Sequence, residues 1–307
     1  MDITLHVGAH RCASTSFQYY LRVNAVALQA RGIAVWGPKR LRSGMLHGLG
    51  HQPLSAADRK AAARAQGRIR LNLATAAQSG ITQVLVSEEN LLGSIRSNLR
   101  RQRLYRDAGE RMARVAGAFG SVTRVVLVVR PQDQYWASAT GLGIARGIAA
   151  PTQDRLDRLV TQPRSWRDVV TDLACAVPGA EILVLPFDRV AGRPDTLLRT
   201  ATGGAPAPRE GREAWRLATP PTPVLRAILR ERGETTPMPE GDGRWDPFND
   251  LQRATLREIW ADDLFWLRAG ADGLAQWLEE ETPSLQAVKA PGAEDRGYAH
   301  DKEGHMV

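Results

Sequence analysis

The chain has 307 residues, of which 43% are hydrophobic and 24% are charged, a composition typical of a folded globular protein. No run of eighteen apolar residues occurs, so we expect no membrane-spanning helix. The first residues lack the basic and apolar regions of a secretory leader, so we expect no secretory leader. Two cysteines, Cys12 and Cys175, cannot form a disulfide framework and show no metal-ligand spacing. These features favour a cytoplasmic location.

The net charge of +8 and the pI near 10.0 raise the question of nucleic-acid binding. The chain has only four lysines against thirty-seven arginines, and most of the arginines are scattered. Aromatic residues do not interleave with them as a base-stacking surface requires. We therefore expect no nucleic-acid partner, because a basic site for an anionic co-substrate or acceptor explains the charge as well. The oligomeric state stays open.

The first predicted element is a β-strand over residues 3–7, in which Ile3, Leu5 and Val7 are apolar. Gly8 opens a short loop, and the loop leads directly into an amphipathic helix. Apolar residues at helical spacing define one face of that helix, namely Phe17, Leu21, Ala25 and Leu28. Such a strand, loop and helix together predict an anion site, because free backbone N–H groups and the helix dipole converge at the helix start.

The side chains of this loop agree with an anionic ligand. Arg11 places a cation inside the loop, and three hydroxyls follow in the first helical turn, from Ser14, Thr15 and Ser16. A phosphate or sulfate ester fits this pattern. The alternative is an ordinary strand followed by a helix that Ser14 caps.

Two acidic residues follow the third predicted strand. A second strand is expected at residues 33–36 and a helix at 56–79, before the apolar strand at 83–87. Glu88 and Glu89 come next, and adjacent side chains of a strand point to opposite sides, so only one of them can face a cleft. Glu88 is the first choice for a catalytic base and Glu89 the second. The alternative is a pair of acids that begin a helix.

A helix over 101–118 and a continuous apolar strand over 124–130 come next. The strand closes with Arg130, and Pro131 suits the first turn of a following helix. Ser138 then lies two turns along that helix, on roughly the same side as Arg130. A guanidinium can bind two phosphate oxygens while a hydroxyl adds one more donor. The alternative is a solvated arginine at a strand end.

The rest of the chain continues the alternation, with a helix around 166–173 and a strand at 181–186. Further helices are expected at 224–232 and 251–267. The sequence thus predicts an α/β fold with a doubly wound parallel sheet flanked by helices. We expect one domain over residues 1–283, with a mostly helical C-terminal part from 205, and a flexible tail over 284–307. Ligands bind at the carboxyl ends of such strands.

Together, the loop and the Arg130–Ser138 segment resemble the sulfotransferase superfamily over about residues 3–270. Members of that superfamily have a P-loop NTPase-like fold and use 3′-phosphoadenosine 5′-phosphosulfate (PAPS). The resemblance implies that Arg130 and Ser138 bind the 3′-phosphate. It implies that the 5′-phosphosulfate is bound by the loop residues Gly8, His10, Arg11, Cys12, Ala13, Ser14, Thr15 and Ser16. The chain departs from the usual loop in having Arg11 in place of Lys and Ala13 in place of Gly.

A looser likeness lies at residues 239–248. Gly241, Gly243, Arg244 and Trp245 resemble the late glycine-rich segment with which many sulfotransferases cover the nucleotide, and Arg244 is the expected contact. A surface turn is the alternative.

The function that the resemblance implies is transfer of a sulfuryl group from PAPS to a hydroxyl or amine of a glycan, a lipid or a small metabolite. Glu88 or Glu89 would be the general base, Arg11 would stabilise developing charge, and no metal is required. Two alternatives stay open. A P-loop kinase would use ATP with magnesium held by Glu88 or Asp133, and an inactive relative would bind the nucleotide without catalysis.

Overall fold

The computed structural model describes residues 1–50, 52–235 and 237–279, so the expected tail at 284–307 lies outside the described residues. Six strands form one sheet in the order β2-β3-β1-β4-β5-β6, and every neighbouring pair is parallel. The strands are β1 (Asp2–Gly8), β2 (Ile33–Trp36), β3 (Gln83–Ser87), β4 (Arg124–Val129), β5 (Glu181–Pro186) and β6 (Gln276–Trp277).

β3 and β4 form because their side chains are apolar on both faces, whereas β1 between them buries two polar residues, Thr4 and His6. β1, β3 and β4 are buried at nearly every position, which the continuous Val and Leu runs of β3 and β4 allow. β1 lies between β3 and β4, so the chain order reverses beside it. Ligand sites of open parallel sheets lie at this reversal, outside the carboxyl ends of the strands.

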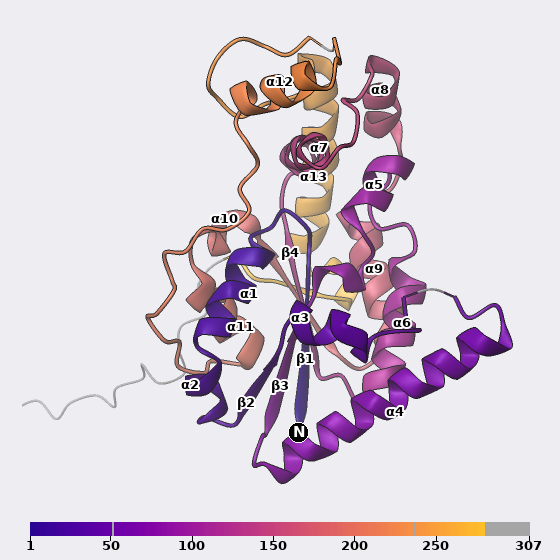
Figure 1. Ribbon diagram of the computed structural model, residues 1–307, viewed down its shortest axis with the longest axis vertical. Coiled ribbons are helices and arrows are strands. Elements are labelled where there is room, and N and C mark those ends of the chain that lie inside the picture. Colours follow the sequence, from indigo (N-terminus) through magenta and orange to yellow (C-terminus); the bar gives the residue numbers. More distant parts are fainter. Residues whose placement is uncertain (51, 236, 280–307) are drawn as a thin grey trace, which may run out of the picture.

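Helices cover both faces of the sheet (Figure 1), which confirms the predicted doubly wound α/β fold. One face is covered by α1 (Ser14–Val23) and α11 (Pro194–Thr202), with α2 (Ala25–Gln29) beside β2. The other face is covered by α4 (Ala56–Gln78), α6 (Ala108–Phe119) and α9 (Trp166–Ala176).

A third group of helices extends beyond the carboxyl ends of the strands, at the top of Figure 1. Its centre is α7 (Gln132–Ala145), which is buried along most of its length. α7 packs against α5 (Ile95–Arg101), α12 (Thr222–Glu231) and α13 (Asp250–Arg268), and α13 also contacts α8 (Gln153–Thr161). This group forms the wall above the sheet edge at which the predicted site residues fall.

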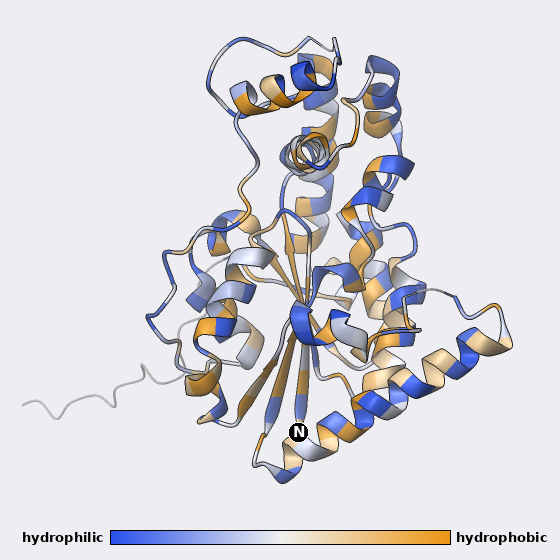
Figure 2. Ribbon diagram, viewed as in Figure 1, coloured by the Kyte–Doolittle hydropathy of each residue, from blue (hydrophilic) through white to orange (hydrophobic). Residues whose placement is uncertain are grey.

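Short helical turns connect these parts. They are α3 (Pro38–Arg40), α10 (Phe187–Val190), the π-helical turn η1 (Leu41–Met45), and the 3₁₀ turns η2 (Glu89–Leu91) and η3 (Ala271–Gly273). The main hydrophobic core surrounds the sheet, and Figure 2 shows hydrophobic residues along much of the strands. A smaller apolar cluster joins the upper helices and contains Ile144, Ala150, Leu225, Leu229 and Trp245.

Three predicted elements differ from the structure. The expected helix over 101–118 begins only at Ala108, because α5 ends at Arg101 and both Gln102 (φ 52°) and Tyr105 (φ 37°) have left-handed backbones. The first helix divides at Asn24, whose side-chain amide donates to the carbonyls of Tyr20 and Glu210.

The helices predicted at 224–232 and 251–267 are present as α12 and α13, but the rest of the C-terminal part is less helical than predicted. Residues 203–221 and the described residues of 232–249 contain no helix. β6 returns the chain to the edge of the sheet.

Candidate functional site

The loop after β1 has the geometry of an anion site. α1 begins at Ser14, and its N-cap residue Ala13 (φ 60°) gives no side-chain hydrogen bond to the first turn. The Ser14 hydroxyl instead donates to the Ala9 carbonyl at 3.1 Å. Arg11 (φ 64°) also has a left-handed backbone. The N–H groups of the first turn of α1 are therefore not capped by a side chain, and a bound anion can accept from them.

Gly8 permits the close approach of the loop to the segment after β3. Its φ is +104°, and a Cβ atom added there would lie 3.0 Å from the Glu89 Cβ atom. A side chain at position 8 would therefore be strained by both the backbone and the contact. Glycine at this position brings the loop and Glu89 together.

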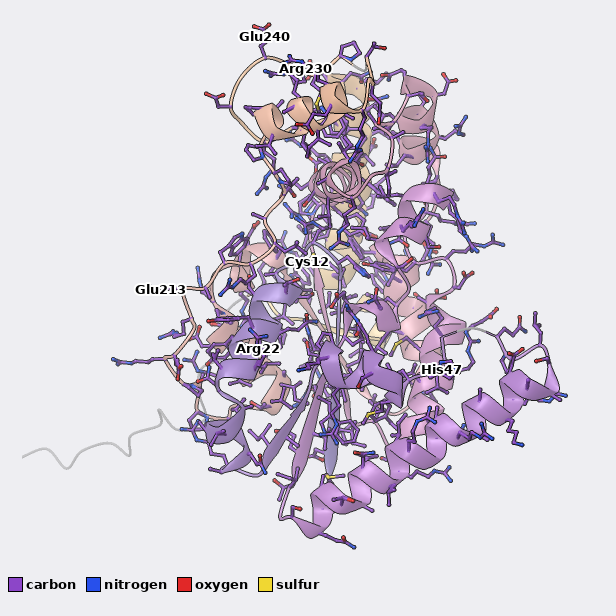
Figure 3. All side chains as sticks on the ribbon, viewed as in Figure 1. Cys12, Arg22, His47, Glu213, Arg230 and Glu240 are labelled. Atoms are coloured by element: carbon purple, nitrogen blue, oxygen red, sulfur yellow. The ribbon has the colours of Figure 1, made fainter. Side chains whose placement is uncertain are left out.

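A cavity of about 240 Å³ opens over this loop and contains most of the predicted site residues. The predicted residues that line it are His10, Arg11, Ala13, Ser14, Thr15, Glu89, Arg130, Ser138 and Arg244. The predicted residues that do not line it are Gly8, Cys12, Ser16 and Glu88. Figure 3 labels Cys12 near the junction between the sheet and the upper helices.

The cavity has a large excess of positive charge. Seven arginines line it, whereas Glu89 is the one carboxylate among its described lining residues. The arginines are Arg11, Arg42, Arg96, Arg130, Arg146, Arg216 and Arg244. Cations held together repel one another, so an anion bound among them is strongly favoured.

Arg11 and Arg130 are the two deepest of these cations. Burial, and next the field of Arg130, lower the pKa of Arg11 to about 10, and burial also lowers the pKa of Arg130. The Arg11 Nε atom donates to the Ser138 hydroxyl at 3.0 Å, and Arg130 Nη1 donates to the Arg11 carbonyl at 3.2 Å. Arg130 Nε is buried without a hydrogen-bond partner. The site thus has donor capacity that an anion would satisfy.

Two aromatic side chains lie beside Arg130. Its guanidinium lies 4.4 Å from the centroid of the Phe187 ring, and the ring of Trp215 meets that of Phe187 edge to face at 6.4 Å. Phe187 and Trp215 both line the cavity. They provide it with an apolar, aromatic wall.

The two predicted carboxylates have different surroundings, although both contact Arg42. Glu88 accepts from Arg42 Nε at 2.7 Å and from Nη2 at 2.6 Å, and its side chain is only 2% exposed. It also accepts from the Asn90 backbone at 2.9 Å and so caps the η2 turn. Glu89 accepts from Arg42 at 3.0 Å and from Gln18 Nε2 at 2.6 Å, and it faces the cavity.

The geometry therefore gives the cavity-facing position to Glu89, whereas the sequence favoured Glu88 for that position. The strand ends at Ser87, and Glu89 already belongs to the η2 turn, so the alternation of side chains along a strand no longer applies to this pair. Burial raises the pKa of Glu89, but the hydrogen bond from Gln18 and the charge of Arg42 act against it, and its pKa lies below the ordinary value.

His10 is held by a buried hydrogen-bond network. The Tyr105 hydroxyl accepts from the His10 backbone N–H at 2.9 Å and from the Tyr135 hydroxyl at 3.3 Å, so its own proton goes to His10 Nδ1 at 2.9 Å. The His10 proton is then on Nε2, which donates to Asn90 Oδ1 at 3.2 Å. Burial lowers the pKa of His10, and the imidazole is neutral with both nitrogens occupied.

Two predicted loop contacts, Cys12 and Ser16, have structural surroundings instead of facing the cavity, and so does Trp245 of the 239–248 segment. Burial raises the pKa of the Cys12 thiol to about 12, so this cysteine is a protonated core residue. The Ser16 hydroxyl accepts from the Arg216 backbone at 2.9 Å. Trp245, next to the cavity residue Arg244, belongs to the small apolar cluster and anchors its segment there.

Sequence reasoning missed several cavity residues. Phe187 directly follows β5 at the carboxyl edge of the sheet, and the rule that ligands bind at that edge could have identified it. Arg42, Arg96, Arg146, Trp215 and Arg216 had no such signal, because they lie in turns or at helix ends without a motif.

No protein-family model matches the chain, and no curated protein matches it. Among solved structures, a crystal structure of a sulfotransferase from Alicyclobacillus acidocaldarius is similar over 89% of this chain and 96% of the other. The identity is 14% and the TM-score is 0.43. An identity and a TM-score this low leave the function to be argued from the residues of this chain. No helix in residues 1–50, 52–235 and 237–279 is long and apolar enough to cross a membrane.

Proposed function

We propose that this protein transfers a sulfuryl group from PAPS to a hydroxyl or amine of an acceptor. The observation that supports the proposal most strongly is the cavity in which the Arg11 loop and the Arg130–Ser138 segment meet. Its seven arginines and one carboxylate suit a ligand with several anionic groups. PAPS has a phosphosulfate at the 5′ position and a phosphate at the 3′ position, so it requires two separate anion sites.

Each part of the nucleotide has a matching group of residues. The 5′-phosphosulfate would bind to the N–H groups at the start of α1, with Ser14 and Thr15 beside it. The 3′-phosphate would bind to Arg130, whose Nε lacks a partner, with Ser138 and Arg244 nearby. The wall formed by Phe187 and Trp215 offers the adenine base an apolar surface.

The Arg11 guanidinium has to exchange its present hydrogen-bond acceptors for phosphate oxygens when the nucleotide binds in this way. Its Nη1 donates to the Leu217 carbonyl at 3.0 Å and its Nη2 to the Thr219 hydroxyl at 2.8 Å, so it holds the segment 217–219 across the cavity. A phosphate oxygen competes well for a guanidinium against neutral oxygens. We expect nucleotide binding to release that segment and to place Arg11 where charge develops on the leaving phosphate.

Glu89 is the proposed general base. It faces the cavity, it is ionised at neutral pH because its pKa is lowered, and Gln18 fixes one of its oxygens. Glu88 does not line the cavity, and both of its oxygens accept from Arg42, so we assign it the task of positioning Arg42. His10 is a less suitable base, since Tyr105 and Asn90 occupy its two nitrogens.

The kinase alternative receives less support from the geometry. It needs Glu88 or Asp133 to hold magnesium, but Arg42 binds Glu88 and Arg257 Nε binds the Asp133 carboxylate at 3.1 Å. Neither carboxylate lines the cavity. An inactive nucleotide-binding relative would share the whole arrangement, and only an assay of transfer separates it from an enzyme.

Binding of adenosine 3′,5′-bisphosphate tests the proposal. We expect this desulfated product to raise the melting temperature without added metal, by mass action on the folded state. ATP with magnesium is the comparison, and stabilisation by ATP alone would favour the kinase. Transfer from ³⁵S-labelled PAPS to a panel of hydroxyl and amine acceptors then tests activity. Binding of the bisphosphate with no transfer to any acceptor would indicate the inactive relative.

A further inference from the structure

A second hollow lies beside the cationic cavity, between α1 and the segment that follows β2. This groove has a volume of about 890 Å³. Single small-molecule ligands occupy sites of about 300–1,000 Å³. Its floor is mostly apolar and includes Tyr19, Leu21, Ala25, Val35, Pro38 and Leu217. The groove therefore suits the apolar body of one small molecule.

The rim of the groove is cationic. Four basic residues line it, and none of its described lining residues is acidic. They are Arg22, which Figure 3 labels on α1, and Lys39, Arg40 and Arg216. Lys39 makes no hydrogen bond or ion pair with another described residue. An anionic group on the bound molecule would complement this rim.

The inner end of the groove reaches the proposed reaction site. Thr15, Arg216 and Leu217 line both the groove and the cationic cavity. Gln18 lines the groove and donates to the carboxylate of Glu89 at 2.6 Å. A molecule in the groove thus has one end at the cationic rim and the other beside the proposed base.

We infer that this groove binds the sulfuryl acceptor, and that the acceptor is an amphiphile bound as a single molecule. Its apolar body lies on the groove floor, an acidic group lies at the rim, and a hydroxyl or amine lies at the inner end. This inference rests on the proposed function. In the transfer, the bond between sulfur and the bridging phosphate oxygen breaks and a bond from sulfur to the acceptor oxygen or nitrogen forms. The acceptor proton passes to Glu89.

The probe for this inference is 12-hydroxydodecanoate, which has a carboxylate, an apolar chain and a terminal hydroxyl. We expect isothermal titration calorimetry on the full chain, below the micelle concentration, to show saturable binding with one molecule per chain. The uncharged 1,12-dodecanediol should bind more weakly, because it lacks the group that the rim attracts. Equal affinity for both would overturn the role of the rim.

Two variants locate the binding. Lys39→Glu reverses one rim charge and should weaken binding of the carboxylate probe by about two- to tenfold, the scale of one or two exposed ion pairs. The matched control is Lys60→Glu, the same change at an exposed lysine of α4 outside the groove, which should leave the affinity within about twofold. Ala25→Trp fills the floor and should abolish binding of both probes. Unchanged binding in Ala25→Trp would overturn the groove as the site.

Adenosine 3′,5′-bisphosphate separates the failure of this inference from the failure of the proposed function. Each variant should bind the bisphosphate as the wild type does, which also shows that it is folded. If the bisphosphate binds and neither probe does, the groove inference fails and the proposed function stands. If the carboxylate probe binds and the bisphosphate does not, the proposed function fails. If the protein binds phosphatidylglycerol vesicles and no free probe, the single-molecule acceptor is wrong.

Discussion

Arg130 supports the loop and is also the proposed ligand of the 3′-phosphate, and a mutation can separate these two roles. It is buried, it supports the loop through the Arg11 carbonyl, and its Nε has no partner. A buried donor without a partner is unfavourable unless a ligand completes it. The fold thus keeps a buried cation with one unmet hydrogen bond, which the proposed anion would complete.

Arg130→Ala should weaken binding of adenosine 3′,5′-bisphosphate by about 2–5 kcal/mol, the usual effect of removing one partner of a desolvated charge pair. It should have little effect on adenosine 5′-phosphosulfate, which lacks the 3′-phosphate. Calorimetric titration with both ligands measures this. Arg124→Ala, at the other end of the same strand, where Arg124 pairs with Glu181, is the control and should leave both affinities unchanged. Equal losses for both ligands in Arg130→Ala would show that Arg130 supports the site as a whole.

Glu89→Gln should lower turnover by about 10²–10⁴-fold, because the amide keeps the shape and cannot accept a proton. Nucleotide affinity should hardly change. Glu88→Gln is the matched variant, and it removes the charge that Arg42 binds. It should mainly lower the free energy of unfolding, by about 1–3 kcal/mol, because a buried charged hydrogen bond is lost.

Steady-state rates and urea unfolding of both variants, measured with one acceptor, decide the assignment. A dead Glu88→Gln enzyme with full stability beside an active Glu89→Gln enzyme would return the role of base to Glu88. Full activity in both would remove both carboxylates from that role.

Among the secondary-structure elements, the geometry of the site depends on the loop that follows β1. Gly8 lies where the loop passes the η2 turn, and the Cβ of Glu89 leaves no room for a side chain there. The amphipathic helix that follows was predictable from its period, because Phe17 and Leu21 are buried on one face. For the loop, small residues between a strand and a helix predicted an anion-binding loop, but not its backbone conformation.

Gly8→Ala should lower the free energy of unfolding more than Gly120→Ala does. Both glycines have positive φ, +104° and +86°, but a Cβ at Gly120 meets nothing within 4 Å. The difference between the variants therefore reports the crowding at Gly8 by Glu89 and by the His10 backbone nitrogen, and overpacking of this kind amounts to about 1–3 kcal/mol. Urea unfolding measures it. If the two variants lose the same free energy, the close approach at Gly8 is not a constraint on the fold.

The helix predicted over 101–118 is an example in which the local sequence pattern does not determine the structure. The Arg-rich sequence there has no proline or glycine before residue 109, so it favours a helix. Tyr105 nevertheless turns into the core, where its hydroxyl joins His10 and Tyr135. These contacts with a loop nearly a hundred positions earlier in the chain outweigh the local helix propensity. The sequence around Tyr105 does not predict them.

For the whole molecule, the central part of the sheet was predictable because β3, β4 and β5 are buried at most positions and therefore read as apolar runs. The two-residue strand β6 has no such run and was not predicted. The carboxyl edge of the sheet then predicted that Gly8, Arg130 and the Glu88–Glu89 pair lie at one edge, although it did not predict that Glu89 faces the cavity. Segments that cross that edge from far along the chain were not predictable. Arg11 bonds Thr219 across 208 residues, and Arg42 reaches both carboxylates from a π-helical turn. Such contacts depend on tertiary packing, which residue periodicity does not encode.

The same central packing makes global stability depend on pH. His6 lies on β1, fully buried, with Nδ1 2.8 Å from the Ser87 hydroxyl of β3 and its ring against Phe17 of α1. Burial lowers the pKa of His6 to about 4. The unfolded chain therefore takes up a proton near the ordinary pKa of about 6.5, whereas the folded protein does so only near 4. The stabilisation is complete above 6.5 and falls as the pH decreases towards 4, by about 3 kcal/mol in all.

Urea unfolding at pH 7 and pH 4.5 should show this loss in the wild type and a smaller one in His6→Asn, which cannot be protonated. The variant leaves a small cavity, so the comparison concerns the change with pH and not the stability at one pH. His10 and the carboxylates titrate alike in both proteins, so the difference between them isolates His6. His47→Asn, at an exposed position labelled in Figure 3, should keep the wild-type dependence. If the free energy of unfolding of His6→Asn depends on pH as that of the wild type does, other groups cause the dependence. The centre of the sheet would then accept a protonated His6.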